Sequence, residues 1–132
     1  REVADGQGVP LGGYLCSASP AEVTLVDATL ACVGKNALIQ RLIADKAYDS
    51  RSLRDELADQ QIELIAPHRK NRKQPKTQDG RSLRRYRKRW IIERTIGWIT
   101  RFRRIATRWD RQLTMYRAFF HVACLIITMR HL

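Results

Sequence analysis

The sequence predicts a mixed α/β domain. Its 132 residues suffice for one domain with a modest core, and a hydrophobic content of 44% is typical of a globular protein. Strand-like and helix-like segments also alternate along it. Their predicted order is two hairpin strands, helix, strand, helix, strand and two helices, which is typical of α/β domains.

The first segments predict a β-hairpin. Val3-Ala4 and Val9–Leu11 flank the turn-forming residues 5–8, Asp-Gly-Gln-Gly, and we expect the second strand to continue to Ser17. Because a domain rarely begins within a strand, we expect this chain to be a piece of a longer protein. A helix should follow, with Ser19 as its cap, Pro20 at its first position and Glu22 completing a capping box, and Gly34 should end it.

Two short strands should flank a second helix. The first, from Leu38 to Ala44, stops at Asp45, and the second spans Ile62–Ala66. The helix between them, Leu53–Leu57, has Asp49 or Ser50 as its cap. Ligand sites in open α/β sheets gather at the carboxyl ends of strands, which makes Asp45 a candidate site residue. The alternative is an ordinary turn residue, because Asp is favoured in turns.

The segment from Tyr86 to Arg104 predicts one long helix with two different faces. At about 100° per residue, one face gathers around Glu93 and holds Tyr86, Arg89, Gly97, Thr100 and Arg104. The opposite face is apolar and should pack into the core; it holds Ile91, Trp98, Phe102, Ile105 and Ala106. Glu93 is either a functional carboxylate at a phosphodiester site or a surface acid paired with Arg89 or Arg94, worth about 0.2–0.5 kcal/mol.

Two further segments complete the pattern. Residues 68–80 are polar and basic and contain Pro75 and Gly80, which predicts a flexible loop. Residues 113–130 are apolar nearly all round, which predicts a buried terminal helix.

The charge is concentrated in one block. Residues 69–111 hold seventeen Lys and Arg against three acidic residues, a balance of +14, whereas residues 1–68 have a balance of −4. Such a block predicts a polyanionic partner, with nucleic acid as the default and an anionic membrane surface or a merely solvated basic face as weaker alternatives. The most apolar stretch, residues 118–129, is too short to span a bilayer.

The three cysteines argue against a disulfide framework and a zinc finger. Cys16, Cys32 and Cys124 are far apart and form no Cys-x-x-Cys pair. We expect them to be small core residues in a protein of the reducing cytoplasm.

Asp45 and Glu93 together suggest phosphoryl transfer with two metal ions. Two Mg²⁺ ions about 3.5–4 Å apart need a bridging carboxylate and further oxygen ligands. One ion would activate the attacking oxygen, and the other would stabilise the leaving oxygen.

At these positions the sequence resembles a known family. Residues 44–50, Ala-Asp-Lys-Ala-Tyr-Asp-Ser, resemble the segment around the second catalytic Asp of bacterial insertion-sequence transposases of the DDE class. The pattern Tyr86-x2-Arg89-x3-Glu93 is similar to their Tyr-Arg-Glu signature, and the resemblance extends from Ala4 to about Asp110.

The resemblance implies an RNase-H-like fold, a mixed sheet with flanking helices, incomplete at the amino terminus. It implies Mg²⁺-dependent cleavage and transfer of DNA strands at insertion-sequence ends. Asp45 and Glu93 would be the metal ligands, and Tyr86 and Arg89 would contact DNA. The implied partners are double-stranded DNA at transposon ends and target, an upstream part of the same transposase and a second copy of the chain, in the bacterial cytoplasm at the nucleoid.

Two departures from the family pattern matter. The family has a Lys or Arg where this chain has Thr100, so Arg101 or Arg104 would take that DNA-binding role. No residue matches the first catalytic Asp, because Asp5 lies in the hairpin turn and Asp27 within the first helix. We therefore expect this chain alone to be inactive. The alternative function is a non-enzymatic DNA-binding remnant or a regulator of transposition, and an RNA-binding protein is a weaker one.

Overall fold

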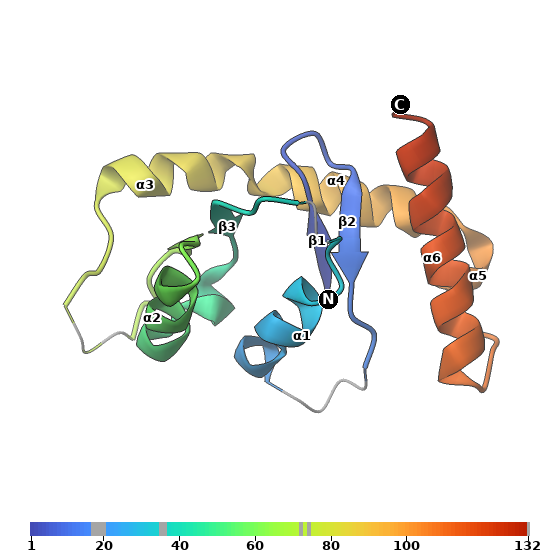
Figure 1. Ribbon diagram of the computed structural model, residues 1–132, viewed down its shortest axis with the longest axis horizontal. Helices are drawn as coiled ribbons and strands as arrows, with labels where there is room; N and C mark the ends of the chain where they lie inside the picture. Colours follow the sequence, from blue (N-terminus) through green and yellow to red (C-terminus); the bar gives the residue numbers. More distant parts are fainter. Residues whose placement is uncertain (17–20, 35–36, 72, 74, 132) are drawn as a thin grey trace. The chain divides into compact units, whose positions relative to one another are not determined.

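The computed structural model describes residues 1–16, 21–34, 37–71, 73 and 75–131 (Figure 1). The chain forms two compact units, each described by itself below. Unit 1 comprises Arg1–Ser17, Ala28–Gly34 and Trp90–Leu132, and unit 2 comprises Ala18–Asp27 and Lys35–Arg89. Both contain helices and a two-stranded sheet, which confirms the mixed α/β class. Among the described residues, no helix has the length and apolar character needed to cross a membrane.

Unit 1 begins with the predicted hairpin. Strands β1 (Glu2–Ala4) and β2 (Pro10–Gly13) pair antiparallel, with Glu2 opposite Gly13 and a register shift after Val3. The turn is held by Asp5, whose Oδ1 accepts backbone hydrogen bonds from Gln7 and Val9, both of 2.8 Å. The second strand is shorter than expected: β2 ends at Gly13, and Ser17 lies outside the described residues.

Unit 1 also contains the helices α4 (Trp90–Ile99), α5 (Arg103–Ala106) and α6 (Leu113–Met129). Both α4 and α5 contact α6, and Figure 1 shows α5 beside it. Their shared core consists of Ile99, Ile105, Phe120, Ala123 and Ile127. Gly13 of β2 makes room for Phe120, because a Cβ at Gly13 would lie 2.6 Å from the end of that ring.

The terminal helix α6 has nearly the predicted length, but it is not buried on all sides. Phe120 and Ala123 are buried, whereas Val122, Leu125 and Met129 are 51%, 59% and 65% exposed. The contacts of α6 with α4, α5 and β2 cover one face of the helix. The prediction of a buried helix, made from its apolar residues on all sides, therefore overestimated its burial among the described residues.

Unit 2 is built around a parallel strand pair. Its elements are the 3₁₀ helices η1 (Glu22–Leu25), η2 (Lys46–Tyr48) and η3 (Tyr86–Arg89), the strands β3 (Arg41–Ile43) and β4 (Glu63–Ile65), and the helices α2 (Arg51–Asp59) and α3 (Gly80–Arg85). In the parallel pair, Leu42 lies opposite Leu64 and Ile43 opposite Ile65.

Helix α2 is capped by Ser50, which is one of the two predicted cap residues. The Ser50 hydroxyl accepts a hydrogen bond from the Leu53 backbone N–H at 3.4 Å. Leu53 and Leu57 are buried, as are Leu64 and Ile65 of the neighbouring strand β4. Strand β3 is less buried than expected: Leu38 is 93% exposed and precedes the strand, which starts at Arg41.

The first predicted helix is shorter than expected. Helix η1 has no side-chain cap at Ala21, and α1 (Val26–Leu30) ends four residues before Gly34. Residues 31–33 form a turn in which the Cys32 and Val33 N–H groups donate to the carbonyls of Thr29 and Leu30. The predicted cap Ser19 and Pro20 lie outside the described residues.

The prediction of one helix from Tyr86 to Arg104 is wrong. Helical structure begins earlier, at Gly80, because the Asp79 carboxylate accepts hydrogen bonds from the N–H groups of Arg81 and Ser82 at 2.9 and 3.2 Å. At the other end, α4 stops at Ile99. The N–H groups of Arg101 and Phe102 donate to carbonyls three residues back, at 3.2 and 3.1 Å, and this tighter spacing ends the α-helix.

Candidate functional site

Asp45 lies at the carboxyl end of the parallel strand pair, as predicted. The Ala44 N–H still donates to the Ile65 carbonyl of β4, at 3.0 Å, and the pairing stops there. Asp45 then caps η2, with its Oδ1 accepting a 2.7 Å hydrogen bond from the Ala47 N–H. Asp45 is thus a turn residue at a strand end.

A broad groove of about 1120 Å³ opens at Asp45 within unit 2. Five of the described residues that line it are cations, namely Lys46, Arg51, Arg69, Lys70 and Lys73. Two carboxylates also line it, and Asp49 is the deeper of them, with a side chain only 1% exposed. The other carboxylate, Asp45, is half-buried. The cations around it suit an anionic ligand that approaches along the groove.

The sequence patterns did not assign Arg69, Lys70 and Lys73 to the Asp45 site. They lie 24 to 28 positions further along the chain, in the segment that was predicted to be a flexible loop and to begin the basic block. One indication was present: this cation cluster follows the end of β4, the strand that pairs with β3. Because parallel strands end at the same edge of a sheet, residues after β4 return to the Asp45 edge.

Tyr86 and Arg89 are brought together in η3 of unit 2. The Arg89 Nη1 donates a hydrogen bond of 3.2 Å to the Tyr86 hydroxyl, and both side chains are partly buried. Helix η3 contacts β3 within the same unit. The Tyr86 hydroxyl therefore helps to fix the position of the Arg89 guanidinium.

Glu93 belongs to unit 1 and lies exposed in the first turn of α4, where the helix dipole favours a carboxylate. The opposite side of α4 is fixed to the hairpin turn. The buried Thr95 hydroxyl donates to the Gly8 carbonyl at 2.7 Å, and Arg94 donates to the Gln7 carbonyl. The Arg94 guanidinium also lies 4.7 and 4.8 Å from the ring centres of Trp90 and Trp98.

The placement of Arg104 on the Glu93 face is corrected. Because α4 ends at Ile99, Arg104 lies in a separate helix, α5. There its Nη1 is 3.7 Å from Asp110 Oδ1, and its guanidinium lies 4.4 Å from the Phe119 ring centre. Thr100 is exposed and donates to the Gly97 carbonyl at the helix end.

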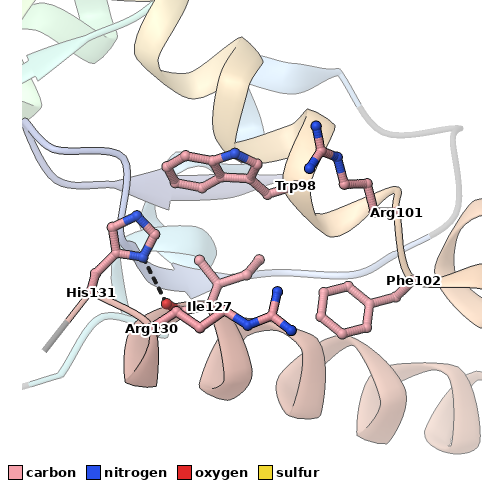
Figure 2. A pocket seen from close by; sticks show the side chains of 6 residues that line it. All are labelled: Trp98, Arg101, Phe102, Ile127, Arg130 and His131. Carbon is pink, nitrogen blue, oxygen red and sulfur yellow. Dashed lines mark hydrogen bonds between the residues drawn. The ribbon is translucent and has the colours of Figure 1, made fainter.

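Arg101 lies exposed in the turn between α4 and α5 and lines a pocket of about 380 Å³. The pocket is formed by Trp98, Arg101, Phe102, Ile127, Arg130 and His131, as Figure 2 shows. The His131 ring centre is 4.7 Å from that of Trp98, and its Nδ1 bonds to the Ile127 carbonyl at 2.8 Å. The pocket combines aromatic walls with two arginines.

The two predicted metal ligands lie in different units of the chain. Asp45 belongs to unit 2 and Glu93 to unit 1. Within the described ranges, no three or more His, Cys, Asp and Glu side chains gather where they could hold a metal ion.

Two groups of unit 1 outside the candidate site, Glu2 and Cys124, have pKa values raised by burial. Burial raises the pKa of Glu2 to about 7, against the opposing effect of the amino-terminal charge. Glu2 Oε1 is buried and has no hydrogen-bond partner among the described residues. Burial and the nearby Glu2 carboxyl raise the pKa of the Cys124 thiol to about 12. All three cysteines are free, and Cys32 is exposed rather than part of the core. Cys124 is therefore a poor nucleophile.

Comparisons with known proteins agree with this arrangement. The sequence model of the family described as "Transposase DDE domain" matches residues 3–128. A Burkholderia cepacia protein, provisionally named a transposase for insertion sequence element IS402, is 34% identical over 133 residues, which cover 95% of this chain and 59% of that protein. A Brucella ovis protein, provisionally named a transposase for insertion sequence element IS6501, is 35% identical over 98 residues, which cover 70% of this chain and 69% of that protein.

No solved structure matches the chain. The chain spans about 59% of the length of the first of these relatives. The family match includes the strand end at Asp45 and the helix that carries Glu93, and it covers nearly all of the sequence. The chain therefore belongs to the DDE-domain transposases of bacterial insertion sequences.

Proposed function

We propose that this chain is the carboxy-terminal portion of a transposase catalytic domain that cleaves and transfers DNA strands at the ends of an insertion sequence. One observation carries the proposal: Asp45 stands at a parallel strand end in a groove lined by five cations among the described residues. A DNA strand carries one negative charge per nucleotide, so such a groove suits its backbone. The relatives named as transposases support the same activity.

In this proposal, Asp45 and Glu93 are the catalytic carboxylates of an RNase-H-like domain. Tyr86, Arg89, Arg101 and Arg104 contact DNA, although Arg104 does so from α5 and not from the Glu93 helix. Divalent metal ions are typical cofactors of the family, and Mg²⁺ is the ion that carboxylate oxygens suit best. A complete two-ion site would need at least one carboxylate beyond Asp45 and Glu93.

The partners in this proposal are double-stranded DNA at the transposon ends and at the target, the upstream part of the same transposase, and a second copy of the chain. The match covers 59% of the Burkholderia cepacia relative, so that protein is longer than the matched region. The setting would be the bacterial cytoplasm, at the nucleoid.

A strand-cleavage assay tests the proposal. A labelled duplex that ends in the insertion-sequence terminus is incubated with Mg²⁺ and either the 132-residue chain or a protein extended by the codons upstream of Arg1. We expect the extended protein to cleave and the chain alone to leave the duplex intact. Glu93→Gln and Asp45→Asn should each abolish cleavage by the extended protein, because an amide keeps the shape and an oxygen acceptor but removes the charge. Cleavage that survives both substitutions would contradict the proposal.

A non-enzymatic DNA-binding protein is the second candidate. It is favoured by the basic groove, whose five described cations suit a nucleic-acid backbone whether or not the protein cleaves it. An extended protein that binds the insertion-sequence end but never cleaves it would support this candidate.

A further inference from the structure

Asp49 is a buried carboxylate with several partners. Its side chain is 1% exposed, directly after η2. Its Oδ1 lies 3.2 Å from His68 Nδ1 and 3.6 Å from an Arg54 guanidinium nitrogen, and its Oδ2 accepts a 3.0 Å hydrogen bond from the Arg69 backbone N–H. Because an unpaired buried charge is strongly destabilising, these contacts explain how the carboxylate is tolerated. They connect the end of the Asp45 turn to Arg69, the first residue of the basic block.

The hydrogen bonds of His68 define its neutral tautomer. The Thr77 backbone N–H donates to Nε2 at 3.3 Å, so Nε2 carries a lone pair and not a proton. The proton of the neutral ring therefore lies on Nδ1, where it is donated to Asp49. The His68 ring thus connects Asp49 to Thr77, nine residues further along the chain than His68.

Arg69 completes the connection to Asp45. Its Nε donates to the Lys46 carbonyl at 3.1 Å, and its Nη2 donates to the Ala47 carbonyl at 2.6 Å. The Lys46 carbonyl and the Ala47 N–H belong to one peptide group, and that N–H is the donor to Asp45 Oδ1. A cation bound to the carbonyl side of a peptide group polarises it and strengthens donation from its N–H side.

We propose that Arg69 and Asp49 are positioning residues for Asp45. Asp49 holds the backbone of Arg69, and the Arg69 fork holds the peptide group that orients the Asp45 carboxylate. Arg69 therefore serves the geometry of the Asp45 carboxylate as well as the positive charge of the groove. The inference rests on the proposed role of Asp45 in DNA cleavage.

Lys70 offers a matched control for Arg69. Both are exposed cations that line the same groove, and the contacts to the Asp45 turn come from Arg69. Arg69→Gln and Lys70→Gln each remove one positive charge, whereas Arg69→Lys keeps the charge and removes the fork.

The first experiment measures hydrogen exchange of the Ala47 amide by NMR in the 132-residue chain. We expect Arg69→Gln and Arg69→Lys to accelerate exchange about tenfold, since each loses a charge-assisted hydrogen bond to this peptide group, and Lys70→Gln to change it less than about twofold. An Arg69→Gln effect no larger than that of Lys70→Gln, or wild-type exchange in Arg69→Lys, would overturn the proposal. Equal melting temperatures show that the variants are folded.

Nitrogen-15 NMR of His68 tests the Asp49 side of the network. The wild-type ring should be protonated at Nδ1, and Asp49→Asn should accelerate exchange of the Arg69 amide, because it removes the charged acceptor of that N–H. A wild-type ring protonated at Nε2 would overturn the contact. If Asp49→Asn does not fold, the wild-type tautomer and the Arg69 variants still decide the outcome.

The second experiment separates this inference from the proposed function. In the extended protein, Arg69→Lys should lower the maximal cleavage rate about tenfold with DNA affinity changed less than about twofold, because it retains the cation. Unchanged cleavage in Arg69→Lys, alongside loss of cleavage in Asp45→Asn, would overturn the positioning role. An extended wild-type protein that does not cleave would refute the proposed function, and the exchange measurements would still decide whether Arg69 holds the Asp45 turn.

Discussion

Glu2 makes the stability of unit 1 depend on pH. Its pKa is about 7 in the folded chain, against an ordinary 4.5, because burial disfavours the charged form. The folded state thus binds more protons than the unfolded state between these values, so stability is highest below about pH 4.5 and falls as pH rises towards 7. At about 1.4 kcal/mol per pKa unit, the loss is at most roughly 3.5 kcal/mol.

Urea unfolding between pH 4.5 and 7 measures this loss. Glu2→Gln is the control, since it has no titratable group at this position and a similar shape. We expect the difference in stability between the two proteins to grow in favour of Glu2→Gln as pH rises. Parallel stability curves would show that the buried carboxyl does not titrate as described.

Arg89 should contribute more to DNA binding than a cation outside the basic block. The Tyr86 hydroxyl accepts a hydrogen bond from Arg89, and a guanidinium can bind a phosphate through two hydrogen bonds. Arg89→Ala should weaken duplex binding about tenfold, and Arg1→Ala, in the acidic part of the chain, less than about twofold. Fluorescence anisotropy measures both affinities. Equal losses would exclude η3 as a contact surface, and Tyr86→Phe reports how much the tyrosine contact itself matters.

Among the elements, α6 carries the core of unit 1 on one face. Phe120 is 6% exposed and packs over Gly13, so Phe120→Ala should destabilise the chain by about 3–5 kcal/mol. Val122 on the same helix is 51% exposed, and Val122→Ala should change stability by about 0.5 kcal/mol or less. Thermal and urea unfolding measure both. A similar loss in the two variants would mean that the outward face of α6 is covered in solution.

Elements with a local chemical marker were predictable from the sequence. The turn residues Asp5 and Gly8 mark the hairpin, and Ser50 marks the start of α2. The break after Ile99 was not predictable from periodicity. Phe102 and Ile105 continue the apolar pattern of Trp98 across the turn, so a helix wheel assigns all three to one face. Trp98 belongs to α4, however, whereas Phe102 caps α5 and Ile105 lies within it.

The candidate site was predictable only where its residues follow a pattern along the chain. Asp45 follows a strand, and Tyr86 and Arg89 have helical spacing. The contacts of Arg69 with the Asp45 turn connect positions more than twenty residues apart. Tertiary packing alone creates such contacts, and no local periodicity encodes them.

At the scale of the whole molecule, the positive charge is concentrated along the sequence. The +14 block of residues 69–111 supplies three of the groove cations, the Arg89 contact in unit 2, and Arg101 and Arg104 in unit 1. Each unit therefore presents cations of its own, as a protein that follows a long polyanion requires. A partner recognised by one small neutral pocket would not need this distribution.

The salt dependence of duplex DNA binding tests this account most directly, because it counts the phosphates that the chain neutralises. Affinity of the 132-residue chain for a duplex is measured by fluorescence anisotropy from about 50 to 200 mM salt. With about six phosphates contacted, the slope of log affinity against log salt should be near −5, with little preference between DNA sequences. A slope between 0 and about −1 would contradict DNA as the main partner of this chain.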